Sequence, residues 1–430
     1  MYLNKKHGLF VALIIIFVLS ACNKQDEESR DGERYEVTER KDIELTEMQV
    51  EYIQLGNTLA VDFIQTIVKK PGLVRQKTDQ DFFVSPLGLE YLLGLLYCGA
   101  TGDGADEILS VFRISKEDGT ELNEYLSSLT SQLKMIDPLV TFSSANLGLI
   151  NKNNYELKDD YVSLTKEYYD AEVTSEDFND CDNLTRRLNM WCYEKTAGMI
   201  PYICPINPWD NFVLFNALYF NGVWKDRFDK EKSCNEIFTK RDGSTITVSM
   251  MKQEGTFGYK KDSVFSLACL PYGNGAYQMY VLLPEEGFNT EDVIDRLKDL
   301  NWNTVTSSIF PMSLEIWLPA FESSSFFDVT PVLYEMGLRN IIKPGNLDRL
   351  AKEIYADKVI QKTLIRVSEE GTEAAAITGA MMDGGGVVDD SIKPRLLEFH
   401  ADKPFIYIIT EQSSGAILYA GRFAGEPDIL

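Results

Sequence analysis

Residues 368–379 read Ser-Glu-Glu-Gly-Thr-Glu-Ala-Ala-Ala-Ile-Thr-Gly, and the interpretation of the whole chain depends on them. Taken alone, the stretch predicts a short helix with Thr372 as its N-cap, an alanine-rich body and a stop at Gly379. The preceding run, residues 359–367, is rich in β-branched residues and predicts a strand. The same residues can therefore also continue that strand in an extended conformation.

In an extended conformation, one face of this segment would be free of charge. Side chains of a strand alternate between its two faces. One face would carry Thr372, Ala374, Ala376, Thr378, Ala380 and Met382. The other would carry Glu373, Ile377 and Asp383. Because burial of an unpaired charge is strongly unfavourable, an uncharged face is what allows a strand to enter a closed core.

This stretch resembles the hinge of the serpins, a family of serine protease inhibitors, in residue type and spacing. The matching hinge residues are Glu369, Glu370, Gly371, Thr372, Glu373, Ala374, Ala375 and Ala376, followed by Thr378. The resemblance continues collinearly from about residue 45 to the end. It includes residues 145–146, 168–173, 189–191, 194–196, 215–224 with 228–229, 318–319 with 321, and 401–405 through 421–422.

The resemblance implies an α+β domain over residues 44–430, with three β-sheets, eight or nine helices and an exposed reactive-centre loop at about 369–395. It implies that the protein is an inhibitor rather than an enzyme. It also implies that the protein needs no cofactor and is a monomer. A target protease of the serine class, or of the cysteine class, would cut the loop and form an acyl-enzyme. The freed hinge would then insert into the main sheet and trap the protease.

The bond that the protease cuts is less well defined than the hinge. The usual family spacing, fourteen residues from Gly371, leads to Gly385 followed by Gly386, but the loop is longer than in typical members. The candidate scissile residues are Met381, Met382, Gly385, Gly386, Val387 and Val388. No Lys or Arg lies between Glu373 and Ser391, which argues against trypsin-like targets. Elastase-, chymotrypsin-, subtilisin- or papain-like proteases fit better.

Four residues match the region that supports sheet opening in the family, namely Ser85, Gly88, Asn216 and Gln361. Two of them depart from its usual pattern, because Gly88 stands where most members have serine and Gln361 where many have histidine. Asp81 also replaces a common asparagine. Because these positions share a hydrogen-bond network in the family, we expect the changes to be coupled, with the Gln361 amide replacing an imidazole.

The N-terminus predicts export and lipidation. Residues 1–21 have a basic start and a short apolar run, as in a signal peptide, and end in Leu-Ser-Ala before Cys22. This resembles the lipobox of bacterial lipoproteins, in which the cysteine is acylated. Residues 22–43 are charged and predict a flexible tether. The acidic residues after Cys22 indicate either outward export on a Gram-negative outer membrane or a solvated linker; the lipid would be the sole membrane contact.

The composition excludes several other functions. With 430 residues and a net charge of −24, the chain is unsuited to binding nucleic acid. It has two histidines, His7 in the signal segment and His400, and no Ser motif near the latter, which argues against a hydrolase. No spacing predicts a zinc site. Six further cysteines are interpreted as free thiols, with the alternative of one disulfide in the region from Cys181 to Cys204, whose connectivity the sequence does not define.

Two alternatives remain for the function. A non-inhibitory serpin would keep the fold, although its usual bulky, charged or proline-bearing hinge is absent here. A surface lipoprotein that binds polysaccharide or peptide is indicated only by the tether and the aromatic residues, which a hydrophobic core explains more simply.

Overall fold

The computed structural model describes residues 38–77, 79–196, 198–200, 202, 205–372 and 396–426. Its helices are α1 (Glu47–Lys69), α2 (Pro86–Gly99), α3 (Gly102–Phe112), α4 (Glu121–Leu133), α5 (Asp159–Tyr169), α6 (Cys181–Lys195), α7 (Thr290–Asp299), α8 (Trp302–Ser307) and α9 (Thr330–Glu335), with a 3₁₀ turn at Pro71–Val74. Its strands are β1 (Phe82–Val84), β2 (Val140–Asn151), β3 (Glu172–Glu176), β4 (Phe212–Val223), β5 (Cys234–Thr239), β6 (Thr245–Lys261), β7 (Phe265–Tyr272), β8 (Tyr277–Pro284), β9 (Phe310–Pro319), β10 (Phe321–Asp328), β11 (Lys358–Ser368), β12 (Gly371–Thr372), β13 (Leu397–His400), β14 (Phe405–Glu411) and β15 (Ile417–Phe423).

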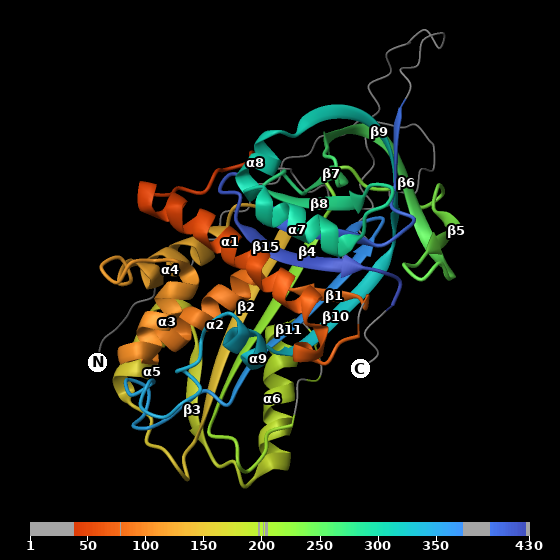
Figure 1. Ribbon diagram of the computed structural model, residues 1–430. Helices are drawn as coiled ribbons and strands as arrows, with labels where there is room; N and C mark the ends of the chain where they lie inside the picture. The colour runs from red at the N-terminus through yellow and green to blue at the C-terminus, as the bar shows by residue number, and fades with distance from the viewer. Residues whose placement is uncertain are drawn as a thin grey trace, which may run out of the picture. The chain divides into compact units, whose positions relative to one another are not determined.

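The main sheet has six strands in the order β10-β11-β12-β4-β2-β3. β4 and β11 also pair directly with each other and run parallel, whereas β10 with β11 and β2 with β4 are antiparallel. Both central strands are almost entirely buried, and the burial includes the polar side chains of Asn216 on β4 and of Gln361 and Thr363 on β11. The long strands β2, β4 and β11 lie side by side in Figure 1.

The second sheet has nine strands, in the order β1-β15-β14-β8-β7-β6-β9-β13 with β5 paired to β6. β6 is 17 residues long and pairs in succession with β5, β9 and β7. The expected second and third sheets are therefore continuous through β6 in the described residues. The α+β fold expected from the sequence is confirmed.

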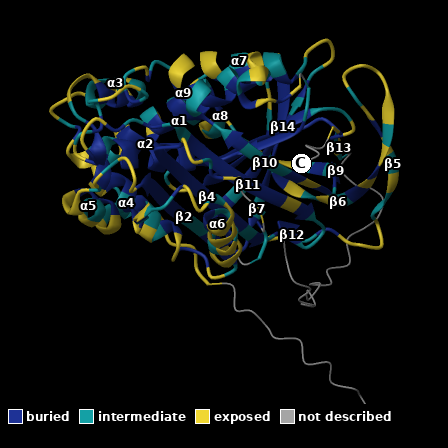
Figure 2. Ribbon diagram, turned by 90° about the horizontal axis from the view of Figure 1, so that it is seen from below, coloured by how far each residue is buried: buried dark blue, intermediate teal, exposed yellow. Residues whose placement is uncertain are grey.

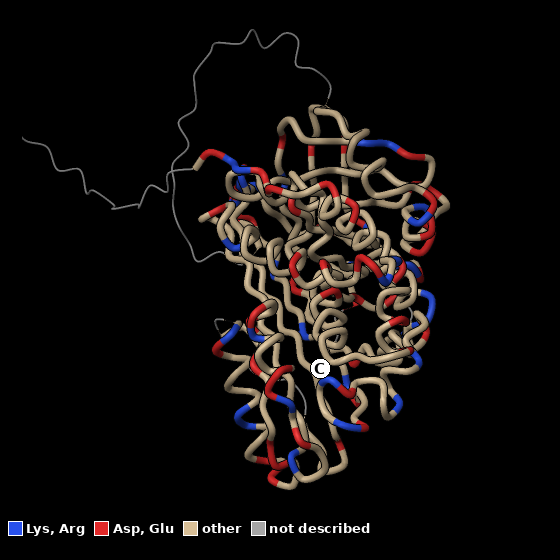
Figure 3. The backbone as a smooth tube through the Cα atoms, turned by 90° about the vertical axis from the view of Figure 1, so that its left-hand side faces the viewer, with Lys and Arg blue, Asp and Glu red and all other residues tan. Residues whose placement is uncertain are grey.

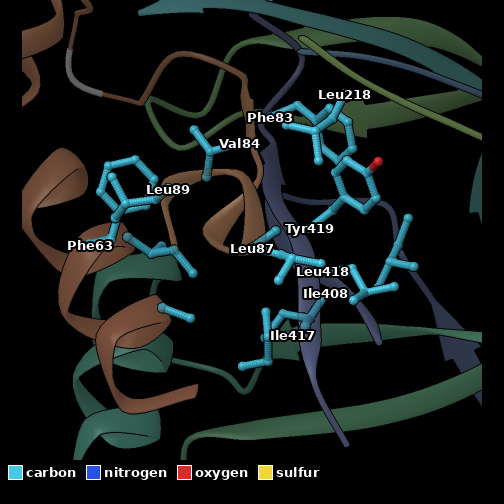
Figure 4. Packing of buried hydrophobic residues seen from close by; sticks show 14 of the residues in the cluster. Phe63, Phe83, Val84, Leu87, Leu89, Leu218, Ile408, Ile417, Leu418 and Tyr419 are labelled. Atoms are coloured by element: carbon cyan, nitrogen blue, oxygen red, sulfur yellow. The ribbon is translucent and has the colours of Figure 1, made fainter. Parts of the chain in front are cut away.

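Helices cover the sheets on both faces. α1 and α2 pack against β15 and β4, and the buried side chains Phe63, Leu87, Leu218 and Tyr419 meet there (Figure 4). α6 covers the opposite face of the main sheet through Leu184, Leu188 and Cys192. In Figure 2 the strands are mostly buried while the outer sides of the helices are exposed. Charged residues gather on the helices and loops, and long stretches of strand carry none (Figure 3).

The elements that the sequence pattern predicts are present, with longer bounds. Apolar residues recur at helical spacing over residues 48–67, and a second helical pattern covers 86–97; these stretches form α1 and α2. The runs at 212–220 and 359–367, rich in β-branched and aromatic residues, form β4 and β11. Similar runs at 278–283, 314–318, 405–409 and 416–420 form β8, β9, β14 and β15.

Ile43 marks where the predicted tether joins the folded body. It is 8% exposed, and its backbone N–H donates to Ser413 at 2.8 Å. The next residue, Glu44, exchanges two hydrogen bonds with the side chain of Gln132 on α4. No helix in the described part of the chain is long and apolar enough to cross a membrane.

Glu90, on α2, is a buried carboxyl without a hydrogen-bond partner at Oε2. It faces Gly56 of α1, where an added Cβ would come within 2.6 Å of its Oε1. Burial raises the pKa of Glu90 from 4.5 to about 8, because the charged form is poorly solvated there. The folded chain therefore keeps this group protonated near neutral pH.

We predict that Glu90→Gln stabilises the protein in a pH-dependent way. Between pH 4.5 and 8 the unfolded chain releases a proton that the folded chain retains, so stability falls as pH rises through this window. The variant should gain about 4 kcal/mol in unfolding free energy at pH 7.5 and less than about 0.5 kcal/mol at pH 4.5. Denaturant unfolding at both pH values tests this, and an equal effect at both would contradict it.

Candidate functional site: the hinge and the seam of the main sheet

The seam between β4 and β11 is the central feature of the site. Residues Lys358–Leu364 pair with Val213–Tyr219 in parallel register. Beyond these residues the two strands no longer pair with each other. There β12 lies between them and pairs antiparallel with both, Thr372 opposite Val367 on one side and Gly371 opposite Val223 on the other. The main sheet is therefore closed along most of the seam and already holds the start of the hinge at one end.

Gly371 allows the chain to turn into the seam. Its φ of +145° lies in a region that residues with a side chain rarely adopt. A Cβ at this position would lie 2.2 Å from the carbonyl oxygen of Gly222 and 2.6 Å from the Cα of Val223. No other residue type fits without displacing the backbone of β4.

Thr372 is the first residue of the hinge to be seated in the sheet. It is fully buried, and its hydroxyl shares a hydrogen bond of 2.7 Å with the hydroxyl of Tyr272. Tyr272 in turn stacks on Trp224, with ring centroids 4.3 Å apart. Burial raises the pKa of Tyr272 well above its usual value, so this phenol is neutral and available for the hydrogen bond.

The turn that precedes Gly371 is held from outside the sheet. The backbone N–H groups of Trp224 and Phe228 donate to the carbonyls of Glu370 and Glu369 at 2.9 and 3.0 Å. The indole N–H of Trp224 donates to the carbonyl of Ser368 at 2.8 Å. These bonds fix the hinge backbone as it leaves β11.

The Glu370 side chain adds two ion pairs to this turn. Its carboxylate accepts from Arg227 at 2.9 Å and from Lys230 at 2.7 Å. The hydrogen bond to Glu370 raises the pKa of Lys230. Because Lys230 is largely exposed, its pair is screened by solvent and adds positional restraint more than stability.

The remaining loop residues lie outside the described part of the chain. They are the hinge residues Glu373, Ala374, Ala375, Ala376 and Thr378, and the scissile candidates Met381, Met382, Gly385, Gly386, Val387 and Val388. Cys22 of the lipobox and Cys204 also lie outside it. The structure therefore positions the hinge up to Thr372.

Beneath the seam, Ser85 and Gln361 are joined by two hydrogen bonds. The Gln361 amide accepts from the backbone N–H of Ser85 at 2.9 Å and donates to its carbonyl at 2.8 Å. The Ser85 hydroxyl caps α2 by accepting from the N–H of Gly88 and donates to the carbonyl of Leu418 at 2.7 Å. The predicted role of the Gln361 amide as both donor and acceptor matches these contacts.

Gly88 faces this amide across a crowded space. A Cβ there would lie 2.3 Å from Oδ1 of Asn216, 2.4 Å from Leu218 and 3.0 Å from Nε2 of Gln361. The glycine thus makes room for Asn216 and Gln361, and the coupling of positions 88 and 361 stays a prediction. Asn216 donates to Asn146 at 2.8 Å, and its buried Oδ1 has no hydrogen-bond partner.

Asp81 does not belong to this network, contrary to the expectation. Its carboxylate accepts from the backbone N–H groups of Ala424 at 2.6 Å and Glu426 at 3.2 Å. Burial is the largest effect on its pKa and raises it to about 6 despite these two hydrogen bonds. Asp81 therefore ties the start of β1 to the end of β15.

Sequence reasoning missed the side chains that hold the hinge. Trp224 lies in a segment that resembles the family, but its contact with Ser368 was not anticipated. Tyr272, Arg227 and Lys230 carry no local motif, since they meet the hinge from 100 or more residues away.

The remaining candidate groups take no part in this site. His400 lies on β13 and stacks on Trp317, with ring centroids 4.2 Å apart. Cys98, Cys181, Cys192, Cys234 and Cys269 are free thiols. Within the described residues, no group of three or more His, Cys, Asp or Glu side chains is arranged to hold a metal ion.

A parallel central seam, with Gly371 and Thr372 of the hinge wedged into one end of the main sheet, is the arrangement that the site presents. The chain belongs to the serpin family, serine protease inhibitors, whose family model matches residues 55–425.

The relatives include proteins from vertebrates and archaea. A leukocyte elastase inhibitor of Bos taurus is 30% identical over 391 residues, covering 87% of this chain and all of the relative. An uncharacterized serpin-like protein of Methanosarcina mazei is 29% identical, with 80% of this chain and 81% of the relative covered.

Solved structures show the same fold. A highly specific serpin of the insect Tenebrio molitor aligns with a TM-score of 0.76 and 25% identity, covering 89% of this chain and 99% of that structure. The thermophilic serpin tengpin in its native state gives a TM-score of 0.77 at 21% identity, covering 91% and 97%. Because the identity to tengpin is only 21%, this second similarity shows the fold alone.

We predict that Gly88→Ala destabilises the protein by about 1–3 kcal/mol, because the new methyl group overpacks the space beneath the seam. Gly72→Ala is the matched control, since a Cβ there meets nothing within 4 Å.

Gln361→Ala should lower the free energy of unfolding by about 1–3 kcal/mol, because it leaves the backbone N–H and carbonyl of Ser85 unpaired.

The Gly88→Ala, Gln361→Ala double variant should lose less than the sum of its single variants, by about 0.5–2 kcal/mol. Denaturant unfolding of all four proteins gives the coupling. Strict additivity would mean that positions 88 and 361 are independent.

Proposed function

We propose that this serpin inhibits proteases by offering residues 373–395 as bait and trapping the enzyme that cuts them. The burial of Thr372 between β4 and β11 is the observation that carries the proposal. This burial supports insertion of the residues after Thr372, because the side chains on the same face of the extended segment are also uncharged. Insertion of a serpin reactive loop is a well-known case of strand addition.

The length of the seam supports trapping rather than simple cleavage. β4 has 12 residues, so a strand inserted beside it would move its far end by about 40 Å. A protease bound through an acyl bond would be carried over that distance. Distortion of its oxyanion hole would then slow deacylation, since loss of one donor alone costs about 3–4 kcal/mol.

The loop sequence favours an apolar primary pocket in the target. The residues between Glu373 and Ser391 lack Lys and Arg, and the candidate scissile residues are methionine, glycine and valine. A relative with 30% identity is an inhibitor of leukocyte elastase by name. We therefore propose elastase-, chymotrypsin- or subtilisin-like targets, with papain-like cysteine proteases as a further class.

We also propose that the protein is an outer-membrane lipoprotein that faces outward, with residues 1–21 removed. The support is the lipobox ending at Cys22 and the acidic residues after it. A single acyl chain binds membranes only marginally, so stable anchoring requires the several chains that a lipoprotein cysteine carries.

We predict that the domain from residue 38 onward forms a covalent complex with an elastase- or subtilisin-like protease that survives boiling in detergent.

Thr372→Arg should convert the inhibitor into a substrate, because a charge that enters the seam unpaired opposes insertion. Gel electrophoresis measures the ratio of complex to cleaved product, which should fall at least tenfold.

Thr372→Val is the matched control, since it keeps the shape and loses only the hydrogen bond to Tyr272. It should still form the complex. Cleavage of the loop should also raise the melting temperature of the wild type and leave that of Thr372→Arg nearly unchanged. Turnover of the loop without any complex across the protease panel would reject inhibition and leave the fold intact.

We predict that Cys22→Ala releases the protein from membranes, because it removes the acylation site. Membrane fractionation and metabolic labelling with palmitate measure this in a Gram-negative host. Cys234→Ala is the matched control and should remain labelled and membrane-bound. Equal labelling of Cys22→Ala and wild type would exclude the lipobox.

A further inference from the structure

A cleft of about 510 Å³ opens at the end of the seam that lies farthest from β12. Four parts of the chain form it: the residues after α1, the loop before β4, the end of β10 with the start of α9, and the start of β11. α9 lies beside β11 in Figure 1. We call it the lower cleft, and its lining includes Arg75, Asn207, Phe326, Asp328, Lys358 and Ile360. Small-ligand sites typically measure about 300–1,000 Å³, so a small molecule fits here.

The floor of the lower cleft consists of apolar side chains on the face of the main sheet that α6 covers. Phe326 and Asp328 are two residues apart on β10, and Asp328 lies opposite Ile360 of β11. Side chains two apart on a strand share a face. Ile360 belongs to the buried cluster beneath α6, and Phe326 packs against it. The apolar part of a ligand would therefore gain by leaving water for this floor.

Two charged side chains of the lower cleft have no ion-pair partner among the described residues. Arg75 is exposed, and its guanidinium makes no hydrogen bond there. The carboxylate of Asp328 accepts from the backbone N–H of Thr330 at 3.0 Å and forms no ion pair. Lys358, in contrast, is paired with Asp210 at 2.7 Å. The cleft thus offers one free cation and one free anion above an apolar floor.

We propose that the lower cleft binds a small zwitterion with an apolar body, of the size of a dipeptide with free ends. Its carboxylate pairs with Arg75, because a guanidinium matches a carboxylate with two parallel N–H bonds. Its ammonium group pairs with Asp328, and its apolar body covers Phe326. A simple anion would face the charge of Asp328 and a simple cation that of Arg75, so the two free charges favour a zwitterion.

The lower cleft lies across the two sides of the seam. Lys358 and Ile360 belong to β11, whereas Asn207 belongs to the loop that leads into β4. These two sides are already joined, because Asp210 accepts both from Lys358 at 2.7 Å and from the backbone N–H of Asn207 at 2.9 Å. A ligand in the cleft therefore contacts both sides and adds to this connection. It is held by its two ends, outside the position that an inserted strand would take.

Insertion of a strand would alter the lower cleft, and this step rests on the proposed function. In the register that Thr372 sets with Val367, a continuing strand would place residue 381 opposite Lys358. The two sides of the seam would then lie one strand spacing, about 4.8 Å, farther apart. A ligand that binds the closed seam opposes insertion, and by linkage insertion weakens the ligand to the same degree. Proteolysis supplies molecules of this class, since each cut peptide bond leaves one ammonium and one carboxylate.

The test is isothermal titration calorimetry of the uncleaved protein with the dipeptide Leu-Phe and two capped forms of it. N-acetyl-Leu-Phe lacks the ammonium group, and Leu-Phe amide lacks the carboxylate. Each capped form should bind the wild type at least fivefold more weakly than Leu-Phe. The effect is moderate because solvent screens exposed charges. This comparison requires no variant of the protein.

Charge-deletion variants assign each end of the ligand. Arg75→Gln should weaken Leu-Phe at least fivefold and should not weaken Leu-Phe amide. Asp328→Asn should weaken Leu-Phe and not N-acetyl-Leu-Phe, and asparagine keeps the acceptor for the Thr330 N–H. Lys134→Gln is the matched control, since it removes an exposed cation from a different cleft of about 350 Å³ beside α4. Its affinity for Leu-Phe should stay within twofold of wild type.

The coupling to the seam has its own readout. Once its loop is cut, the wild type should bind Leu-Phe at least fivefold more weakly. Saturating Leu-Phe should also lower the ratio of covalent complex to cleaved product. The ratio for Arg75→Gln should not respond to the peptide, which separates this effect from any action of the peptide on the protease.

The outcomes separate this site from the proposed function. Equal affinity for all three peptides, or wild-type affinity in both charge-deletion variants, would overturn the inference. If the covalent complex forms and Leu-Phe does not bind, the lower cleft is rejected while inhibition stands. If Leu-Phe binds with both charge dependences and no protease forms a complex, the site is supported and the proposed function fails. Equal affinity before and after a cut that raises the melting temperature would reject the coupling to the seam.

Discussion

The seam between β4 and β11 governs the rest of the structure. Two parallel strands pair here over Lys358–Leu364, and the sheet then widens to admit Gly371 and Thr372. Main-chain hydrogen bonds along the closed part resist further insertion, whereas each inserted residue would form such bonds on two sides. In the proposed mechanism, the fully paired sheet would be the one with an extra strand, and the buried Thr372 would be the first step toward it.

The contacts beneath the seam set how readily it opens. Gln361 belongs to β11, and its amide holds both backbone groups of Ser85 at the start of α2. β11 thus cannot separate from α2 unless two buried groups lose their partners, at about 1–3 kcal/mol each. Gly88 keeps the space that this amide needs. The predicted coupling of positions 88 and 361 follows from this fit, since a small residue at position 88 leaves space for the long amide at position 361.

The sequence predicts the parts of this arrangement that depend on local pattern. The helical spacing of α1, the apolar runs of β4 and β11 and the hinge motif can all be read along the chain. It does not reveal Tyr272 or Arg227, because a tyrosine or arginine on a strand end has no signal for a contact 100 residues away. The expectation that Asp81 belongs to the network beneath the seam was wrong for the same reason. Its hydrogen-bond partners, Ala424 and Glu426, are at the other end of the chain. The resemblance to serpins supplied the long-range information that periodicity lacks.

The turn at Glu369 and Glu370 is what would let insertion outrun deacylation in the proposed mechanism. Starting a new strand normally requires the chain to reverse and fix several dihedral angles before any contact is gained. Here the reversal already exists, with Gly371 at a φ of +145° and Thr372 bonded to Tyr272. The ion pairs of Glu370 with Arg227 and Lys230 keep that end fixed. In the proposed mechanism, insertion after cleavage would therefore begin as the extension of an existing strand, without the slow initiating step.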